Sequence, residues 1–111
     1  MIVIRNVFRL KFGKAREAIA LMKEGRAIEK RVMGGLDYSS RVLSDVTGPF
    51  YTLVLEVTVP NLAAFETAAP RLFGDAEWQA HYRKVEPLVE SGYREVFSIV
   101  ERSDAAEPRH D

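Results

Sequence analysis

The sequence predicts a single α+β domain in which a four-stranded antiparallel sheet carries both of its helices on one face. Three observations support this fold class. The chain has 111 residues, enough for one hydrophobic core but not for two. Apolar residues make up 47% of it and charged residues 29%, the balance of a globular protein. The spacing of the apolar residues changes along the chain in the order strand, helix, strand, strand, helix, strand.

The first third of the chain predicts a strand followed by an amphipathic helix. Residues 2–11 are rich in β-branched and aromatic side chains, and Gly13 ends this strand. Over residues 14–32 the apolar side chains recur every three or four positions, as they do on a helix with one buried face. Gly25 lies in the middle of this helix, where glycine costs about 1 kcal/mol relative to alanine. We therefore expect another part of the chain to pack closely against Gly25.

Two strands, 38–46 and 50–59, follow the glycine pair that ends the helix. A turn at residues 47–49, Thr-Gly-Pro, joins them as a hairpin. The second strand alternates an apolar face with a mixed one, as expected for a strand with one face in the core. The apolar face contains Tyr51, Leu53, Leu55 and Val57.

The remainder predicts a helical region in two pieces and a last strand. Asn61 is the expected N-cap of the first piece, which Pro70 and Gly74 interrupt. Asp75 is the expected N-cap of the second piece, over residues 76–91, with Pro87 near its final turn. We expect Gly92 to end that helix before a strand over residues 93–101. The domain would thus span residues 1–101, with a frayed polar tail over residues 102–111.

This element order is that of the ferredoxin-like βαββαβ fold. Helices cover only one face of such a sheet, yet here the strands are apolar on both faces. We expect the uncovered face to be buried against a second copy of the chain, although a half-exposed face is the alternative. The apolar residues assigned to it are Val3, Val7, Phe50, Val54, Val96 and Val100. The polar residues assigned to it, which would line an enclosed space, are Arg5, Arg9, Thr52, Glu56, Arg94 and Ser98.

Two segments carry a resemblance to a known superfamily. One is residues 3–14, Val-Ile-Arg-Asn-Val-Phe-Arg-Leu-Lys-Phe-Gly-Lys, which lead from the first strand into a charged helix. The other is residues 78–82, Trp-Gln-Ala-His-Tyr. Over about 100 residues the chain resembles the dimeric α/β-barrel superfamily, in which two ferredoxin-like units pack sheet to sheet. Within it the chain is similar to the NIPSNAP-like and antibiotic-biosynthesis-monooxygenase-like groups, and Trp78 followed by Tyr82 favours the first.

Composition excludes several classes of function. Acidic and basic residues number 16 each, so the chain lacks the basic excess of a nucleic-acid-binding protein. The absence of cysteine excludes disulfides, thiolate catalysis and cysteine-ligated metals. No apolar stretch approaches the roughly 20 residues that span a bilayer, and the N-terminus does not read as a signal peptide, so we expect a cytoplasmic protein without a membrane partner. No phosphate-binding or dinucleotide motif occurs, and we expect neither a cofactor nor a metal site.

The candidate functional residues fall into two groups. His81 is a candidate general base or haem ligand, and Tyr82 beside it is a candidate for proton transfer. Charged strand residues form the second group, because buried charges require a partner or a charged ligand. In it Glu56 is the catalytic candidate, and the candidates for binding a carboxylate or phenolate are Arg5, Arg9, Arg41, Tyr51 and Arg94. The alternative for this group is a structural ion-pair network at the dimer interface.

Three functions are compatible with these observations. The first is a homodimer that binds a small apolar or aromatic molecule, neutral or anionic, in a barrel cavity and acts as a cofactor-independent oxygenase or isomerase. In it Arg5, Arg9 and Glu56 would orient the ligand, and His81 or Tyr82 would assist proton transfer. The second is a non-catalytic NIPSNAP-like or stress-related interaction module. The third is haem binding through His81.

Overall fold

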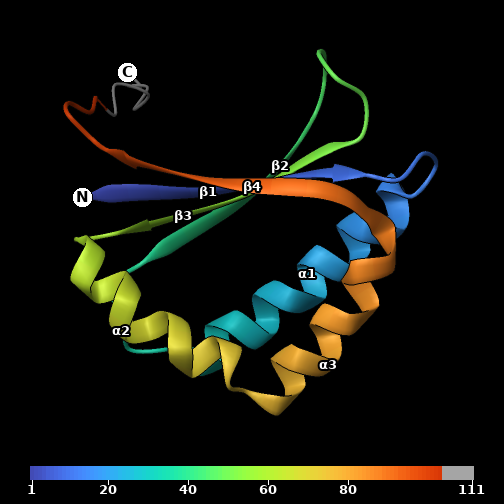
Figure 1. Cartoon of the computed structure of the whole chain (residues 1–111). Helices are drawn as coiled ribbons and strands as arrows, with labels where there is room; N and C mark the ends of the chain where they lie inside the picture. The colour runs from blue at the N-terminus through green and yellow to red at the C-terminus, as the bar shows by residue number, and fades with distance from the viewer. Residues whose placement is uncertain (104–111) are drawn as a thin grey trace, which may run out of the picture.

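Four strands form one antiparallel sheet in the order β2-β3-β1-β4, and the helices lie on one of its faces (Figure 1). The computed structural model describes residues 1–103, so His110 and most of the expected tail lie outside the described residues. The elements are β1 (Ile2–Leu10), α1 (Ala15–Val32), β2 (Ser39–Ser44), β3 (Thr52–Val59), α2 (Leu62–Phe73), α3 (Ala76–Val85), the short 3₁₀ helix η1 (Glu86–Leu88) and β4 (Val89–Ser98). The ferredoxin-like α+β fold expected from the sequence is confirmed.

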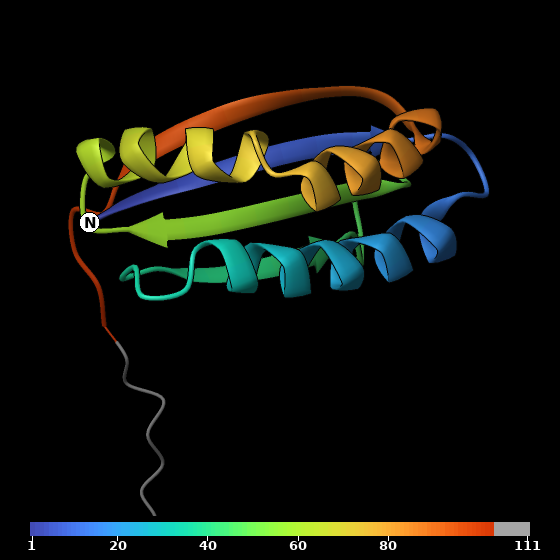
Figure 2. The ribbon, with the colours of Figure 1, turned by 90° about the horizontal axis from the view of Figure 1, so that it is seen from below.

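The helical layer has two rows, which are clearest when the molecule is seen from the helix side (Figure 2). One row is α1, and the other consists of α2 and α3 in succession. Asn61 and Asp75 cap these two helices as expected, since their side chains accept hydrogen bonds from the backbone N–H groups of Ala64 and Trp78 at 2.9 and 3.0 Å. The expected break between the two helices is therefore real at Gly74, whereas Pro70 does not interrupt the first helix but lies inside α2.

The predicted C-terminal end of the helix over residues 76–91 is wrong. The α-helix stops at Val85, and Gly92 lies inside β4 opposite Phe8. Pro87 explains the early stop, because proline lacks the N–H that would continue the helix. A Cβ at Gly92 would stand 3.0 Å from the Phe8 ring, so this glycine allows the aromatic side chain to lie across the strand.

The two strands of the hairpin are shorter in the structure than the sequence predicts. β2 ends at Ser44, and β3 begins only at Thr52, whose backbone N–H donates to the Asp45 carboxylate at 3.0 Å. Phe50 and Tyr51 therefore lie in the turn and not in a strand. Tyr51 has φ of 64°, the left-handed region that non-glycine residues rarely adopt.

The strand register settles which side chains share a face, because directly paired residues point to the same side. On the helix side Ile4 pairs with Val57 and Val96, and Asn6 pairs with Leu55 and Arg94. The assignment of Val96, Arg94 and Ser98 to the uncovered face is thus wrong, since the partners of all three belong to the helix side. Arg5, Val7 and Arg9 do lie on the uncovered face, as expected.

The hydrophobic core is divided into three clusters of buried residues. One joins β1, β3, α1 and α3, the second joins the β1 and β3 ends near α2, and the third joins α1 to α2. Their central members are Leu10, Ala18, Met22, Leu53 and Val85; Ile4, Val57 and Val59; and Met33, Ala68 and Leu72. A divided core leaves space between the clusters, and that space is the site described below.

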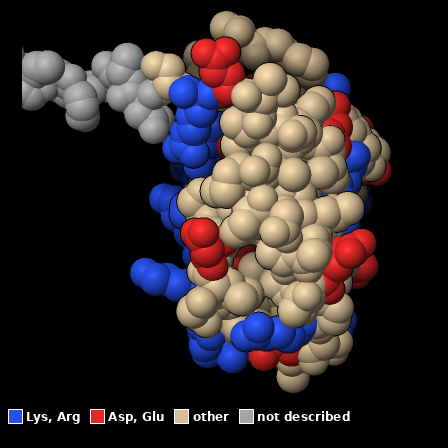
Figure 3. Space-filling model, turned by 90° about the vertical axis from the view of Figure 1, so that its left-hand side faces the viewer, with Lys and Arg blue, Asp and Glu red and all other residues tan. Residues whose placement is uncertain are grey.

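Uncharged residues run down the middle of the side that carries α2 and the N-terminus, with charged residues flanking them (Figure 3). Within residues 1–103, none of the helices combines the length and apolar character needed to cross a membrane. The expectation of a cytoplasmic protein is not tested by this finding.

Candidate functional site

A cavity lies between the sheet and the helices, and it has two adjoining lobes. The smaller lobe has a volume of about 200 Å³ and lies between α1 and α3. The larger has a volume of about 630 Å³ and extends under α2 to the edge strand β4. Five residues line both lobes: Phe8, Glu29, Leu55, Trp78 and Tyr82. Space of this size, with mostly apolar walls and few polar groups, is typical of small-molecule sites.

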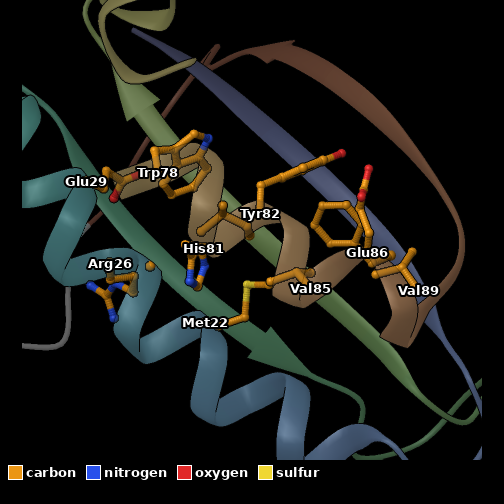
Figure 4. A pocket seen from close by; sticks show the side chains of 12 residues that line it. Met22, Arg26, Glu29, Trp78, His81, Tyr82, Val85, Glu86 and Val89 are labelled. Atoms are coloured by element: carbon orange, nitrogen blue, oxygen red, sulfur yellow. The ribbon is translucent and has the colours of Figure 1, made fainter. Parts of the chain in front are cut away.

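Glu29 is the buried acid of this cavity. Its side chain projects from α1 toward Trp78 (Figure 4), and the residue is only 4% exposed. Its Oε1 atom has no hydrogen-bond partner among the described residues. Burial raises the pKa of the Glu29 carboxyl, and a hydrogen bond from the Ser40 side chain and the charge of Arg26 oppose this rise. A buried carboxyl oxygen without a partner is costly, so a polar ligand group that reached Oε1 would recover free energy.

Glu29 is not among the residues predicted from the sequence, although the sequence contains a signal for it. Ala18, Met22, Gly25, Glu29 and Met33 are all buried, at spacings of four, three, four and four residues. This is the helical stripe that faces the sheet. A carboxylate on that stripe is a buried charge in an apolar row, and such a group is a functional candidate.

His81 packs against Gly25, which confirms the expectation of close packing at this glycine. A Cβ at Gly25 would stand 2.5 Å from His81 Nε2, so only glycine leaves room for the ring. The His81 side chain is 3% exposed and its ring lies 5.5 Å from that of Trp78 (Figure 4). His81 thus forms part of the wall between α1 and α3.

The two ring nitrogens of His81 are both turned toward α1. Nδ1 lies 3.2 Å from Glu24 Oε1, which also accepts from Lys84 Nζ at 3.1 Å. These two partners lower the pKa of the Glu24 carboxyl, with the His81 hydrogen bond as the larger cause. Nε2 faces α1 so closely that a Cβ on Gly25 would lie 2.5 Å from it, so His81 does not fit the role of haem ligand. Within residues 1–103, no three metal-ligating side chains gather at one place.

Tyr82 lies on the same helix and is half exposed, and it lines both lobes. In the close-up its side chain runs from α3 across the cavity toward the sheet (Figure 4). Tyr82 therefore offers an aromatic wall and a phenol group to a molecule in the cavity. Its assignment to proton transfer stays a prediction.

Arg94 lies at the open edge of the larger lobe, on β4. Its Nε donates to Asn6 Oδ1 at 2.7 Å, and its guanidinium lies 5.6 Å from the centre of the Phe65 ring. Asn6 is uncharged, so this arrangement positions Arg94 without neutralising it. Of the five sequence candidates for ligand binding, Arg94 is the one that reaches the cavity.

The other charged strand residues lie on the uncovered face, with the sheet between them and the cavity. Glu56 sits between Arg41 and Arg5, which pair with it in register on β2 and β1. Arg41 Nε donates to Glu56 Oε1 at 2.7 Å, and Arg5 Nε lies 3.7 Å from Glu56 Oε2. The expectation that Glu56, Arg5 and Arg9 share one space with His81 and Tyr82 is therefore wrong. The alternative weighed for this group, a structural ion-pair network, describes Arg41, Glu56 and Arg5.

Tyr51 also lies away from the cavity. Its ring contacts Phe12 edge to face at 5.1 Å, at the end of the molecule where the β1–α1 and β2–β3 loops meet. Its backbone oxygen accepts from the Leu10 N–H at 2.8 Å, which ties the turn to β1. A role for Tyr51 in binding a molecule inside the cavity does not fit this position.

No family model and no curated protein matches the sequence, but solved structures do. An uncharacterised NIPSNAP domain protein from Burkholderia xenovorans is 20% identical, covers 98% of this chain and 100% of its own, and superposes with a TM-score of 0.77. A NIPSNAP family protein from Agrobacterium tumefaciens is 23% identical over 95% of this chain and 88% of its own, with a TM-score of 0.73. The chain shares the fold of these proteins.

A second group of similar structures consists of oxygenases. A variant of SnoaB, a cofactor-independent oxygenase from Streptomyces nogalater, is 16% identical over 96% of this chain and 97% of its own, with a TM-score of 0.64. The resemblance to both groups expected from the sequence is confirmed at the level of fold. Identities this low carry no residue's role from one protein to another.

Proposed function

We propose that the chain binds a small apolar or aromatic molecule in the cavity between sheet and helices and catalyses a proton transfer on it with Glu29 as the base. The observation that carries this proposal is the unpaired Oε1 of Glu29, which is buried in an otherwise apolar cavity. A carboxyl with a raised pKa is suited to general base catalysis, because its pKa lies closer to the working pH than that of an ordinary glutamate.

The chemistry follows from this one step. Glu29 takes a proton from an acidic C–H group, and the electron pair stays on the conjugated substrate. In an isomerase the Glu29 carboxyl returns the proton to a different carbon. In a cofactor-independent oxygenase the carbanion adds to dioxygen and the proton goes to the resulting peroxide; loss of water from this hydroperoxide leaves a ketone. Tyr82, at the wall of both lobes, donates a hydrogen bond to the substrate in either case.

The proposal includes a homodimer formed through the uncovered face of the sheet. Val7 pairs in register with Val54 and Tyr93 on this face, and Val3 pairs with Phe97. Tyr93 and Phe97 are 61% and 50% exposed in the single chain. An apolar face of this kind suits a sheet-to-sheet contact between two copies of the chain. The row of ion pairs formed by Arg41, Glu56 and Arg5 would then lie between the two sheets.

Native mass spectrometry of the purified protein tests the binding and the dimer together. We expect a dimer that carries a small molecule or accepts one. Proton transfer is tested by deuterium exchange into enolisable aromatic ketones in D₂O, followed by NMR. Glu29→Gln should slow the exchange at least ~100-fold, because general base catalysis contributes about 10²–10⁴. Glu17→Gln, an exposed glutamate on the same helix, is the matched control.

The similarity to NIPSNAP proteins of unknown role favours a second candidate, a non-catalytic module, since their TM-scores exceed that of the oxygenase. Binding without exchange by the native protein would support this candidate. Equal exchange by the Glu29→Gln variant and the native protein would contradict the proposed base.

A further inference from the structure

We infer that the ligand of this cavity is an aromatic or conjugated carboxylate with a hydroxyl group at its other end, bound with the carboxylate at Arg94 and the hydroxyl at Glu29. This inference rests on the proposed function, because it assigns the ligand of the same cavity. It is carried by the two ends of the larger lobe, which differ in charge and in exposure.

The outer end of the lobe is positive. Arg94 and Arg83 both line it and are both exposed. Within the described part of the chain neither forms a salt bridge, and the one hydrogen bond of Arg94 goes to the neutral Asn6. That bond uses Nε, so both terminal nitrogens of the Arg94 guanidinium are available to an anion. A carboxylate fits two parallel N–H groups of one guanidinium.

Two contacts hold Arg94 in a fixed orientation. Asn6 Oδ1 accepts from Nε at 2.7 Å, and the Phe65 ring lies 5.6 Å from the guanidinium carbon. Asn6 and Arg94 are paired in register on neighbouring strands, so the backbone itself brings the two side chains together. Holding the guanidinium in place reduces the conformational entropy that anion binding would otherwise cost.

The inner end of the lobe is acidic. Glu29 is nearly inaccessible and its Oε1 lacks a partner, so the ligand group that pairs with Oε1 must be small and must donate a hydrogen bond, and the C–H that Glu29 deprotonates must lie next to that group. A second carboxylate is excluded there by repulsion from an ionised Glu29 and by the cost of burying two acids. A hydroxyl meets the requirement, since it donates to either oxygen without adding charge.

The body of the ligand between these ends is flat and apolar. The walls of the lobe that Arg94 and Glu29 both line include the aromatic side chains Phe8, Trp78 and Tyr82. Aromatic walls favour an aromatic or conjugated body over a flexible aliphatic chain, because rings stack without losing rotamer freedom. The order along the lobe is therefore carboxylate, conjugated body, hydroxyl.

The test uses Trp78, the only tryptophan of the chain, as the reporter of an occupied cavity. Three probes are titrated by tryptophan fluorescence and by calorimetry: 4-hydroxyphenylacetate, its methyl ester and 4-methoxyphenylacetate. We expect the free acid to bind at least ~10-fold more tightly than the ester, the ratio that one charge-assisted hydrogen bond supplies. We also expect the hydroxyl probe to bind more tightly than the methoxy probe.

Two variants locate these preferences. Arg94→Gln should remove the preference for the acid over the ester, whereas Arg16→Gln, an exposed arginine of α1 away from the cavity, should keep it. Glu29→Met, which leaves no acceptor at this position, should remove the preference for the hydroxyl probe and leave the acid preference in place. Both arginines are exposed, so neither variant is expected to unfold.

The outcomes separate this inference from the proposed function. If the acid and the ester bind with equal affinity to the native protein, the inferred orientation is wrong while the cavity remains a binding site. The inference is equally overturned if the Arg16→Gln and Arg94→Gln variants lose the acid preference to the same extent. If no probe changes the fluorescence or releases heat at millimolar concentration, both the inference and the proposed binding of aromatic molecules fail.

Discussion

The ion-pair row on the uncovered face of the sheet and the cavity on the helix side differ in how their charged groups are paired. On the uncovered face Glu56 contacts both Arg41 and Arg5 in one row across three strands. On the helix side Glu29 has an unpaired oxygen, and Arg94 contacts only an uncharged amide and a ring. Charges that are paired within the chain stabilise the sheet or an interface, whereas charges left unpaired in a cavity are compensated by a ligand. This contrast supports a structural role for the ion-pair row and supports the proposed ligand site on the helix side.

The largest effect is expected from a charge placed on the uncovered face. Val7→Glu puts a carboxylate among the apolar residues of that face, where a sheet-to-sheet dimer would bury it without a partner. We expect the dimer dissociation constant to rise by at least ~100-fold, measured by analytical ultracentrifugation. Ala20→Glu, on an exposed position of α1, should leave it unchanged. A native protein that is monomeric at micromolar concentration would contradict the assignment of this face.

On the helix side, Gly25→Ala should destabilise the domain. The added Cβ would meet His81 Nε2 at 2.5 Å, so the ring must move and the contact between α1 and α3 must loosen. We expect a loss of about 1–3 kcal/mol in urea unfolding, although alanine is the better helix former. The double variant Gly25→Ala with His81→Ala should lose less than the sum of the two single losses, because both act on one contact. A stabilising Gly25→Ala would show that the ring packs elsewhere.

Glu56→Gln tests the structural side of the contrast. The amide keeps the shape of the side chain but removes the charge that both arginines contact, so we expect a loss of about 1–2 kcal/mol. Affinity for the probes in the cavity should stay the same, since the sheet lies between Glu56 and the lobes. If the variant lost probe binding without losing stability, Glu56 would have a role in ligand binding and not in structure.

The smallest effect is expected from a substitution of Glu29, and it is a gain in the free energy of unfolding and not a loss. The folded-state pKa of Glu29 is raised, so the stability associated with its neutral form is present at low pH and is lost as pH rises through that pKa. Glu29→Met removes this loss and should raise the free energy of unfolding by about 1 kcal/mol above that pKa, with probe affinity reduced. The gain should shrink as pH falls toward the ordinary range of a glutamate. A gain that is independent of pH would show that the carboxyl is not the cause.

Much of the fold was predictable because its signals are local. The periodicity of residues 14–32, the N-caps at Asn61 and Asp75 and the tight packing at Gly25 all follow from neighbours in the sequence, and the structure confirms them. The errors came where two local signals competed. Gly92 is a helix terminator in isolation, but Pro87 had already ended the helix, and the glycine serves a strand contact with Phe8.

The candidate site was predictable only in part, for a geometric reason. The sequence indicated which residues are charged and that strands alternate their faces, yet the face of a strand residue depends on where its strand begins and on its register. The last strand begins at Val89 and not at Tyr93. Its pairing with β1 decides which face of the sheet each of its residues occupies, and Arg94 pairs with Asn6 on the helix side. Register is decided by hydrogen bonds to a strand more than 80 residues away in the chain.

The amino-acid sequence by itself determined the fold class, the order of the elements and the apolar character of both sheet faces, because these depend on composition and on spacing along one segment. The tertiary structure decided which charges are paired and which are not. Glu29 and Trp78 face one another across two helices, and Glu56 lies between two arginines of different strands. Pairing depends on distances between segments far apart in the chain, and only the packing of α1 and α3 on the sheet sets those distances.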